Sequence, residues 1–395
     1  MQNKPIQTDV LIIGASASGL MCAIEAGKRG RKVIVLDHAN KAGKKILMSG
    51  GGRCNFTNYN ISPDNYISHN PHFCKSALSR YTQWDFITMV SEHKIPFHER
   101  DHGQLFCDDN AKDILNMLLN ECKQVGVKIQ LNCKINKVDK KDSFIIDSSL
   151  SKFTAKSLVI ASGGLSIPKM CASPFGYKIA EQFGHHIWPT SAGLVPFTLQ
   201  PLDKEKLSEL SGISIECIVS NEKSSFKENI LFTHRGLSGP AILQISSYWD
   251  AGEPITINLL PELDVFEILK TRQSKQSNIK LKTVLTELLP KRLIPALLDE
   301  EIINKPLQEL SQLRIQEIAT QLQQWTIKPN GTEGYRTAEV TLGGVDCDEL
   351  SSKTMESKKT GDLYFIGEVI DITGWLGGYN FQWAWSSGWC AGQVV

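Results

Sequence analysis

The chain opens with two apolar runs separated by a helical repeat. Residues 10–13 form a continuous apolar run, which is typical of a strand buried on both faces of a parallel sheet. From Leu20 to Gly27 small and apolar residues recur at helical spacing, and residues 32–37 contain a second apolar run that stops at Asp37. This order predicts a strand, a helix packed on the sheet and a second, parallel strand.

The later pattern predicts an α/β chain with an insertion. Helical repeats cover residues 70–93 and 111–125, and a buried strand covers residues 157–161. Residues 262–326 read as mainly helical, after a series of short strand-like runs. We therefore predict a nucleotide-binding domain in two parts and one inserted domain, with the boundaries 1–192 for the first part, 193–332 for the insert and 333–395 for the last part.

A glycine-rich turn separates the first predicted strand from the helix. Gly14, Ser16 and Gly19 follow the strand at the spacing of a dinucleotide-binding turn, and Asp37 ends the second strand. In such units the first glycine permits a tight turn, the helix N-terminus faces a pyrophosphate, and the acid holds a ribose hydroxyl. Ser16 stands where glycine is usual, so the backbone approaches the phosphate less closely, although its hydroxyl can donate a hydrogen bond. A purely structural turn is the alternative interpretation.

Residues 41–58 combine consecutive glycines with lysines, an arginine and asparagines, which is unlike a core element. The loop is either a solvated surface segment or a wall of the nucleotide site. Its position directly after Asp37 favours the second interpretation, because glycines let the backbone approach a ring or a phosphate and cations face anionic oxygens. The candidate contacts in this loop are Lys44, Lys45, Ser49, Gly50, Gly51 and Arg53.

Cys54 lies in the same loop and is the candidate for acid–base chemistry, together with Arg53. A cysteine is most often a small buried hydrophobic residue. Beside a cation and close to a cofactor, however, a cysteine can act as a proton donor or as a thiolate. Arg53 and Cys54 are therefore the predicted catalytic residues.

Two later strands also end in glycines. Residues 157–161 lead into Gly163, and a strand near the C-terminus ends at Gly367 and Glu368. Gly378 then precedes a helix, whose N-terminus can stabilise the pyrimidine oxygen of a reduced flavin, while Glu368 can hold ribityl hydroxyls. A well-packed strand and helix is the alternative, but so many glycines would weaken those elements without a reason.

Composition narrows the class of protein. The chain has 395 residues, 41% of them hydrophobic and 22% charged, as in ordinary globular proteins with two domains. No apolar run approaches the roughly 20 residues that cross a bilayer, and the first strand begins too early for a signal peptide. The ten cysteines show no C-x-x-C spacing, which argues against a zinc site and a disulfide framework. We expect a cytoplasmic protein with reduced thiols and no metal.

Charge adds one local feature. The net charge of +1 gives no support to a broad basic face for nucleic acid. Between Lys270 and Arg292, however, seven cations face a single acid. Such a run is usually a solvated helix face, but it is the best local candidate for docking a polyanion.

Five motifs together resemble a known family. They are the N-terminal βαβ unit, the Ser-Gly-Gly-Gly-Arg-Cys-Asn loop from Ser49, the Thr-His-Arg-Gly-Leu-Ser-Gly-Pro turn from Thr233, the Val-Thr-Leu-Gly-Gly-Val strand from Val340, and the C-terminal Gly-Glu…Gly-Gly-Tyr-Asn-x-Gln segment. With these motifs the chain resembles the BaiN/RdsA-type (YhiN-like) FAD-dependent oxidoreductases, nearly end to end. The resemblance implies a Rossmann-like FAD-binding domain of the two-dinucleotide-binding type, interrupted by a β-barrel and helices.

The resemblance also implies contacts to FAD. By position, Ala17, Ser18, Asp37, Lys45, Glu368, Asn380 and Phe381 would touch the cofactor, and Ile135 would meet the adenine through its backbone. The other candidate cofactor contacts are Gly14, Ser16, Gly19, His38, Lys44, Ser49, Gly50, Gly51, Gly163, Gly367, Gly378 and Tyr379.

Activities attached to the family share one chemistry. One branch resembles a dihydrouridine synthase acting on large-subunit (23S) ribosomal RNA, and another reduces conjugated double bonds of bile-acid intermediates. Both deliver a hydride from reduced flavin to an electron-poor C=C and add a proton at the adjacent carbon. Because no second nucleotide fingerprint is present, NAD(P)H is expected as a transient reductant without a domain of its own.

Three functions stay open on the sequence alone. The first is reduction of a ribosomal RNA uridine, with the stretch from Lys270 to Arg292 as a possible RNA contact. The second is the same chemistry on a small apolar metabolite, for which an aromatic pocket would be the sign. Its candidate lining residues are Trp375, Tyr379, Trp383 and Trp385. The third is a non-catalytic RNA-binding factor that carries flavin.

Overall fold

A computed structural model describes residues 4–395 of the chain. The chain divides into two compact units: residues 4–191 with 340–395, and residues 192–339. The second unit is an insertion in the first. It starts one residue before the predicted insert and ends seven residues after it. The chain leaves the first unit through β11 (Ile187–Gly193) and returns in β19 (Val340–Val345).

The first unit is built on a sheet whose central strands are parallel. β1 (Ile6–Ile13) lies between β2 (Val33–Leu36) and β10 (Lys152–Ile160), and both pairings are parallel. β7 (Lys128–Gln130) extends the parallel part beyond β2. Residues 10–13 are all buried, so burial on both faces explains the continuous apolar run, as predicted.

β10 has two neighbours along its other edge. Its first residues pair with β9 (Phe144–Ser148), which pairs with β8 (Ile135–Lys140), and both pairings are antiparallel. Its last residues pair in parallel with β20 (Leu363–Phe365). The carboxyl ends of β1, β10 and β20 are in register, so the segments after them begin at one edge of the sheet, where ligands bind in open α/β sheets.

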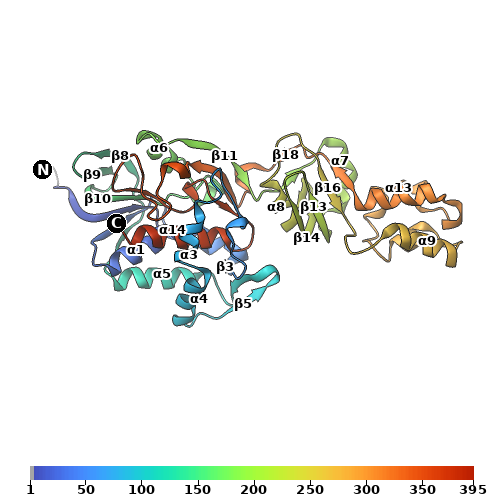
Figure 1. Cartoon of the computed structure of the whole chain (residues 1–395), viewed down its shortest axis with the longest axis horizontal. Helices are drawn as coiled ribbons and strands as arrows, with labels where there is room; N and C mark the ends of the chain where they lie inside the picture. Colours follow the sequence, from blue (N-terminus) through green and yellow to red (C-terminus); the bar gives the residue numbers. More distant parts are fainter. Residues whose placement is uncertain (1–3) are drawn as a thin grey trace. The chain divides into compact units, whose positions relative to one another are not determined.

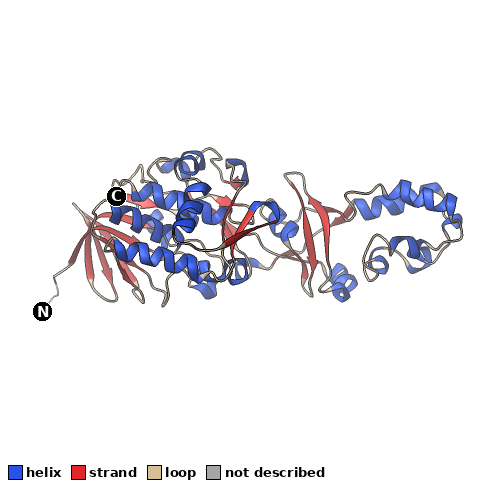
Figure 2. Cartoon of the chain, turned by 90° about the horizontal axis from the view of Figure 1, so that it is seen from below, coloured by secondary structure: helices blue, strands red, loops and turns tan. Residues whose placement is uncertain are grey.

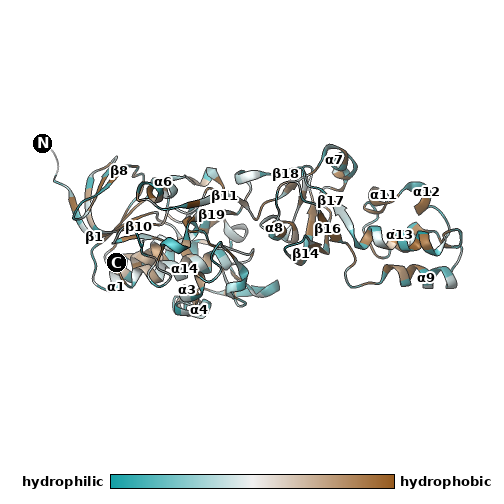
Figure 3. Cartoon of the chain, turned by 45° about the horizontal axis from the view of Figure 1, so that its top comes forward, coloured by the Kyte–Doolittle hydropathy of each residue, from teal (hydrophilic) through white to brown (hydrophobic). Residues whose placement is uncertain are grey.

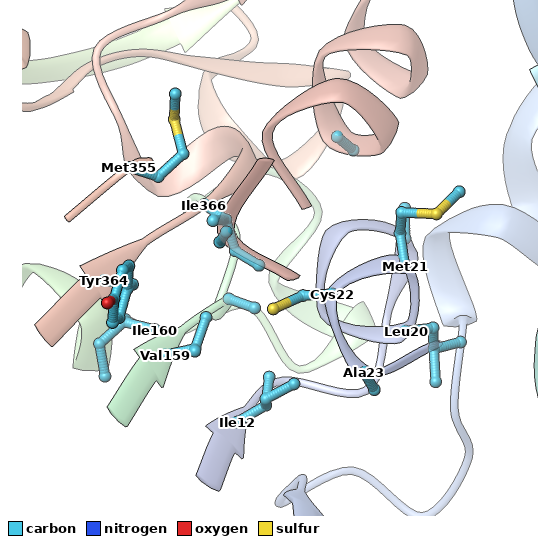
Figure 4. Close-up of a cluster of buried hydrophobic side chains, with 14 of the residues drawn as sticks. Ile12, Leu20, Met21, Cys22, Ala23, Val159, Ile160, Met355, Tyr364 and Ile366 are labelled. Carbon is cyan, nitrogen blue, oxygen red and sulfur yellow. The ribbon is translucent and has the colours of Figure 1, made fainter. Parts of the chain in front are cut away.

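Two helices cover the sheet beside this edge. α1 (Ala17–Lys28) and α14 (Tyr379–Gly392) lie side by side (Figure 1). Their backbones approach closely because α14 presents glycines; a β-carbon on Gly388 would lie 2.5 Å from the Ser18 carbonyl oxygen. Side chains of β1, α1, β10 and the end of β20 gather beneath them in a buried cluster (Figure 4). The N-terminal and C-terminal segments therefore share one core.

One predicted helical run consists of two helices. The repeat over residues 70–93 forms α3 (Cys74–Arg80) and α4 (Gln83–Glu92). The break occurs because Thr82 caps the second helix: its hydroxyl accepts the Asp85 N–H, and the Asp85 carboxylate accepts the Thr82 N–H at 2.7 Å. A capping box of this kind fixes a helix start inside an apolar repeat.

The first unit is completed by small sheets and further helices. Its other elements are the sheet of β3 (Asn55–Asn58), β6 (Gln104–Cys107) and β5 (Phe97–Arg100), the pair β4 (Tyr66–Ile67) and β21 (Thr373–Gly374), and the helices α2 (Lys44–Met48), α5 (Lys112–Gln124) and α6 (Phe175–Gln182).

The second unit consists of a seven-stranded antiparallel sheet and a group of helices. The strands that were expected to form a barrel run in the order β17 (Trp325–Ile327), β16 (Ile255–Asn258), β13 (Ser214–Ser220), β14 (Ser225–Phe232), β15 (Gly236–Ser238), β12 (Phe197–Thr198) and β18 (Gly331–Thr332). The helices are α7 (Pro201–Leu207), α8 (Pro240–Ser246), α9 (Val265–Lys275), α10 (Leu281–Leu285), α11 (Ile294–Leu297), α12 (Glu300–Ile303) and α13 (Gln312–Gln323). α9 and α13 lie beside one another, and α13 also contacts β16 and β17 of this sheet. Figure 2 shows the helices and strands of the chain in separate colours.

Both of these helices carry hydrophobic and hydrophilic residues (Figure 3), as helices with one buried face do. Leu269 of α9 and Ile315, Ile318 and Leu322 of α13 are buried. Across residues 4–395, no helix combines the length and the hydrophobicity needed to cross a bilayer.

A buried histidine of the first unit gives a pH-dependent prediction. Burial lowers the pKa of His185 from its usual value of 6.5, and the nearby Glu349 carboxylate opposes this shift without overcoming it. Because the folded state prefers neutral imidazole, its contribution is complete above pH 6.5 and falls as the pH drops towards the lower folded pKa. We expect urea unfolding of the wild type to become easier over this window. His185→Gln should lack that part of the pH dependence; identical slopes for both proteins would contradict the prediction.

Candidate cofactor site

The turn between β1 and α1 has the geometry of a phosphate-binding turn. Gly14 has a φ of +121°, and a β-carbon there would lie 2.1 Å from the Ala161 carbonyl oxygen. Ser16 occupies the N-cap of α1 without a side-chain capping hydrogen bond. The N–H groups of the first turn, including those of Ala17 and Ser18, are therefore not capped by Ser16 and form the positive end of the helix. Gly19 is needed for packing, since its β-carbon would lie 2.0 Å from the Gly14 carbonyl oxygen.

Asp37 ties the glycine turn to the second strand. Its Oδ2 accepts the Ala15 N–H at 2.7 Å, and its Oδ1 accepts the Ala39 N–H at 2.8 Å. His38 lies beside it, half exposed, with Nδ1 3.7 Å from Asp37 Oδ1. The carboxylate thus has a structural role that the sequence did not indicate. The contact of Asp37 to a ribose and the contact of His38 to the cofactor stay predictions.

Lys45 and Glu368 are brought together from opposite ends of the chain. Lys45 Nζ lies 2.7 Å from Glu368 Oε2 and 2.7 Å from Ser166 Oγ. Glu368 Oε1 accepts the Thr341 N–H at 3.0 Å and the Ser166 hydroxyl at 3.3 Å. The Lys45 and Glu368 side chains are 28% and 19% exposed, so a ligand can reach both.

Two glycines that follow β10 let the backbone pass close to this polar cluster. Gly163, with a φ of +70°, follows β10, and a β-carbon there would lie 3.7 Å from Glu368 Oε2. At the neighbouring Gly164 a β-carbon would lie 2.4 Å from Thr341 Oγ1. The two glycines therefore keep the backbone close to the cluster at the carboxyl edge of the sheet. The sequence did not indicate that Ser166 and Thr341 belong to this cluster, although both lie in or beside its glycine motifs.

The glycine loop after α2 is packed at Gly50, where a β-carbon would lie 2.7 Å from the Phe106 ring, and open at Gly51 and Gly52. Gly50 and Gly51 have φ values of +58° and +65°, and no other group approaches a β-carbon at Gly51 within 4 Å. The Ser49 hydroxyl donates to the Ile46 carbonyl at 2.8 Å, and Lys44 Nζ lies 3.1 Å from Cys171 Sγ. Within residues 4–395, the exposed Arg53 guanidinium has no hydrogen-bond or ion-pair partner. The Arg53 guanidinium is thus free to meet an anionic ligand.

Cys54 is placed differently from its neighbour. Its side chain is completely buried, and burial raises the pKa of the thiol to about 12. Desolvation therefore disfavours the thiolate form that the sequence left open. The neutral thiol still carries a proton, so the proton-donor role stays a prediction that requires access to a buried group.

The C-terminal glycines position α14. Gly367, with a φ of +73°, donates its N–H to Ser387 Oγ at 3.0 Å. Gly378 is the N-cap of α14 with a φ of +95°, and a β-carbon there would lie 2.3 Å from the Thr57 carbonyl oxygen. The carbonyl of the buried Tyr379 accepts the Tyr66 hydroxyl at 2.9 Å. The start of α14 is therefore held against β3 and β4.

Several residues of α14 and the turn before it that were candidates for ligand contacts bind other parts of the protein instead. The Asn380 amide accepts the Gly374 N–H and donates to the Gly374 carbonyl, both at 2.8 Å, so it holds the turn before α14. Phe381 stacks on Trp385 with 5.5 Å between ring centroids. Trp383 and Trp385 are core residues whose indole N–H groups donate to the Gly367 and Phe56 carbonyls. These two tryptophans do not line an aromatic pocket, which corrects that expectation.

Ile135 begins β8, near the strand end that carries Asp37. The Cys133 N–H donates to the Asp37 carbonyl at 2.8 Å, and the Asn132 N–H donates to the Ala39 carbonyl at 3.0 Å. The segment before Ile135 is thereby fixed beside the acid. An adenine contact of its backbone is compatible with this placement and stays a prediction.

The residues at this edge fit a flavin dinucleotide. A glycine turn and the uncapped start of α1 suit a pyrophosphate, while Glu368 and Lys45 offer an acceptor and a donor to ribityl hydroxyls. The open glycine loop leaves space on one side, as the absence of any group near a β-carbon at Gly51 shows.

Comparisons with known proteins agree with this architecture. The family model described as the HI0933-like protein Rossmann domain matches residues 8–394. A curated protein of Escherichia coli named ribosomal RNA dihydrouridine synthase is 53% identical over 98% of this chain and 97% of its own length. The protein of the same name from Haemophilus influenzae is 51% identical over 95% of this chain and 96% of its own. A 3-dehydro-bile acid delta(4,6)-reductase of Clostridium scindens is 28% identical over 97% of this chain and 98% of its own. The chain belongs to the HI0933-like Rossmann family.

Proposed function

We propose that this protein is an FAD-dependent oxidoreductase that uses NAD(P)H to reduce a uridine of 23S ribosomal RNA to dihydrouridine. The observation that carries the proposal is similarity above 50% identity, over nearly the whole length, to two relatives that bear the name of that activity. The site described above supports it, because it suits a flavin and leaves an open loop beside it. We also propose that the RNA contacts the stretch between Lys270 and Arg292.

The cofactor would be held by groups at the carboxyl edge of the sheet. The N-terminus of α1 would bind the pyrophosphate, Asp37 and the Ile135 backbone the adenosine, and Lys45 and Glu368 the ribityl chain. When bound, FAD supplies the hydride for the C=C bond. The start of α14 at Gly378 favours negative charge near it, and the exposed Arg53 would orient the substrate.

The proposal is tested on ribosomal RNA. Cells that lack the gene should lose dihydrouridine from large-subunit RNA, and adding back the purified flavoprotein with NADPH should restore it. Nucleoside analysis by mass spectrometry measures both. Unchanged dihydrouridine content would overturn the RNA substrate and leave an ene-reductase of a small apolar metabolite. A protein whose flavin is never reduced by NADH or NADPH would instead be the non-catalytic RNA-binding factor.

The small-molecule alternative has one supporting observation, the 28% identity to a bile-acid reductase. Its expected sign was an aromatic pocket. Trp383 and Trp385 are buried in the core, so only Trp375 and Tyr379 remain of the four candidates for the pocket lining. Tyr379 is itself buried. We therefore rank the RNA substrate first.

Replacing Cys54 tests the remaining proton-donor role. We expect Cys54→Ala to slow reduction of the substrate while FAD stays bound, because the alanine cannot supply a proton. The matched control is Cys107→Ala, since Cys107 is equally buried, burial also raises its pKa to about 12, and its N–H donates to the Arg53 carbonyl. Stopped-flow measurement of flavin reoxidation by substrate separates this step from reduction by NAD(P)H. Equal rates for both variants would remove Cys54 from the mechanism.

A further inference from the structure

The basic stretch of the second unit contains two kinds of cation. Lys270 Nζ lies 3.6 Å from Glu267 Oε1, and Arg272 pairs with Glu287, so acids neutralise these two. The remaining five make no side-chain hydrogen bond or ion pair with any part of the chain that the structure describes: Lys275, Lys280, Lys282, Lys291 and Arg292. Four of the five are exposed and Lys282 is half-buried.

These five cations, the free-cation surface, are held on a defined framework. α9 and α10 bury Leu269, Leu281 and Leu285, which fixes the faces that the helices turn outward. Lys275 is the last residue of α9 and Lys280 is the N-cap of α10, and the connection between them is tied by its backbone to residues 305–308. In it, the Leu307 N–H donates to the Ile279 carbonyl at 2.9 Å, and the Leu281 N–H donates to the Lys305 carbonyl at 3.1 Å. Lys275, Lys280 and Lys282 are thus carried by folded elements, while Lys291 and Arg292 lie just before α11.

The same part of the chain has almost no aromatic side chains on which an unpaired base could stack. Phe266 is the only aromatic residue between positions 262 and 324. Lys270 Nζ lies 5.5 Å from the centroid of the Phe266 ring and covers it. Stacking on aromatic side chains is the main way in which proteins hold unpaired bases, so this surface lacks the means for it.

We propose that the free-cation surface binds the sugar–phosphate backbone of RNA and does so without regard to base sequence. This inference rests on the proposed function for its RNA partner, and adds that docking and base selection are separate: phosphates are held by the second unit, and the uridine is selected in the first. A helix face that serves solubility alone mixes charges of both signs. Seven cations against one acid, in a chain of net charge +1, is a different distribution.

The test removes the five charges and measures RNA affinity against salt. The variant carries Lys275→Ala, Lys280→Ala, Lys282→Ala, Lys291→Ala and Arg292→Ala. The control removes five cations from elsewhere in the same unit and so has the same net charge. Its substitutions are Lys204→Ala, Lys206→Ala, Lys223→Ala, Lys227→Ala and Lys328→Ala, all at exposed positions. Circular dichroism and flavin content verify that both holoproteins are folded.

Affinity is measured by fluorescence anisotropy with a labelled fragment of 23S RNA and with an unrelated RNA of equal length. Five phosphate contacts predict that wild-type affinity falls about 100- to 500-fold between 50 and 200 mM salt, for either RNA. In the five-alanine variant the salt slope should drop by about 3.5 to 4.5, while the control keeps most of its slope. Reduction of the flavin by NADPH should be unchanged in both.

The outcomes separate this inference from the proposed function. If the five-alanine variant binds RNA with the wild-type salt slope, the free-cation surface is not the docking surface, whatever the enzyme does. A clear preference for the 23S fragment that disappears in the variant would show that the surface reads sequence, which also overturns the inference. If the wild type binds RNA as expected but forms no dihydrouridine, the proposed reaction fails and the docking surface stands.

Discussion

Replacing Glu368 with alanine is expected to yield protein that is largely free of flavin. Glu368 accepts hydrogen bonds from Lys45, Ser166 and the Thr341 backbone, and we propose that its partly exposed carboxylate also accepts from ribityl hydroxyls. A hydrogen bond to a charged group contributes about 1.5–3 kcal/mol, so losing one raises the dissociation constant of FAD about 10- to 150-fold. Two lost bonds would exceed that range. Absorbance of the purified protein and titration with FAD measure the effect.

Two further variants show whether the loss of flavin is due to the Glu368 carboxylate itself. Glu368→Gln keeps the shape and one acceptor oxygen but loses the ion pair with Lys45, so we expect an intermediate affinity. Glu25→Ala removes a carboxylate of similar exposure, 13% against 19%, which pairs with Lys28 at the far end of α1. This control should keep its flavin. If Glu368→Ala retains its yellow colour at normal stoichiometry, the ribityl assignment is wrong.

The parts of the site that are local in sequence were predictable from it. The turn from Gly14 to Gly19 follows from an apolar strand, a glycine and a helical repeat, and the structure places all three as expected. The parallel pairing of β1 with β2 follows from the same pattern. Each of these features depends on neighbours within one βαβ unit, where side-chain periodicity and steric limits on φ decide the outcome.

The hydrogen-bond partners of the candidate residues were not predictable. Glu368 is 323 positions from Lys45 in the chain and 202 from Ser166, and no periodicity links such segments. Asp37 and Asn380 were assigned to a ligand, yet both side chains bind nearby backbone groups. A polar side chain beside a glycine turn can serve the turn or a ligand, and the residue type is the same in both cases.

Gly14→Ala is expected to prevent stable folding of the first unit. Gly14 lies between two strands: its N–H donates to the Leu36 carbonyl at 2.8 Å, and the Ala161 N–H donates to the Ile13 carbonyl at 2.8 Å. A β-carbon 2.1 Å from the Ala161 carbonyl oxygen would meet backbone that both strands hold in place. The left-handed conformation alone costs about 1–2 kcal/mol, and the clash should take the loss beyond about 4 kcal/mol, which is a large share of the stability of a domain.

Gly30→Ala isolates the clash from the conformational cost. Gly30 has a φ of +78°, and no group lies within 4 Å of a β-carbon there. Alanine at this position should therefore lower the free energy of unfolding only by the cost of the left-handed conformation, about 1–2 kcal/mol. Urea unfolding of the proteins, or the soluble fraction after expression if Gly14→Ala does not fold, measures the difference. Equal stability of the two variants would mean that the strands around Gly14 can separate. The turn between β1 and α1 would then owe its shape to a bound cofactor, because the sheet alone would not impose it.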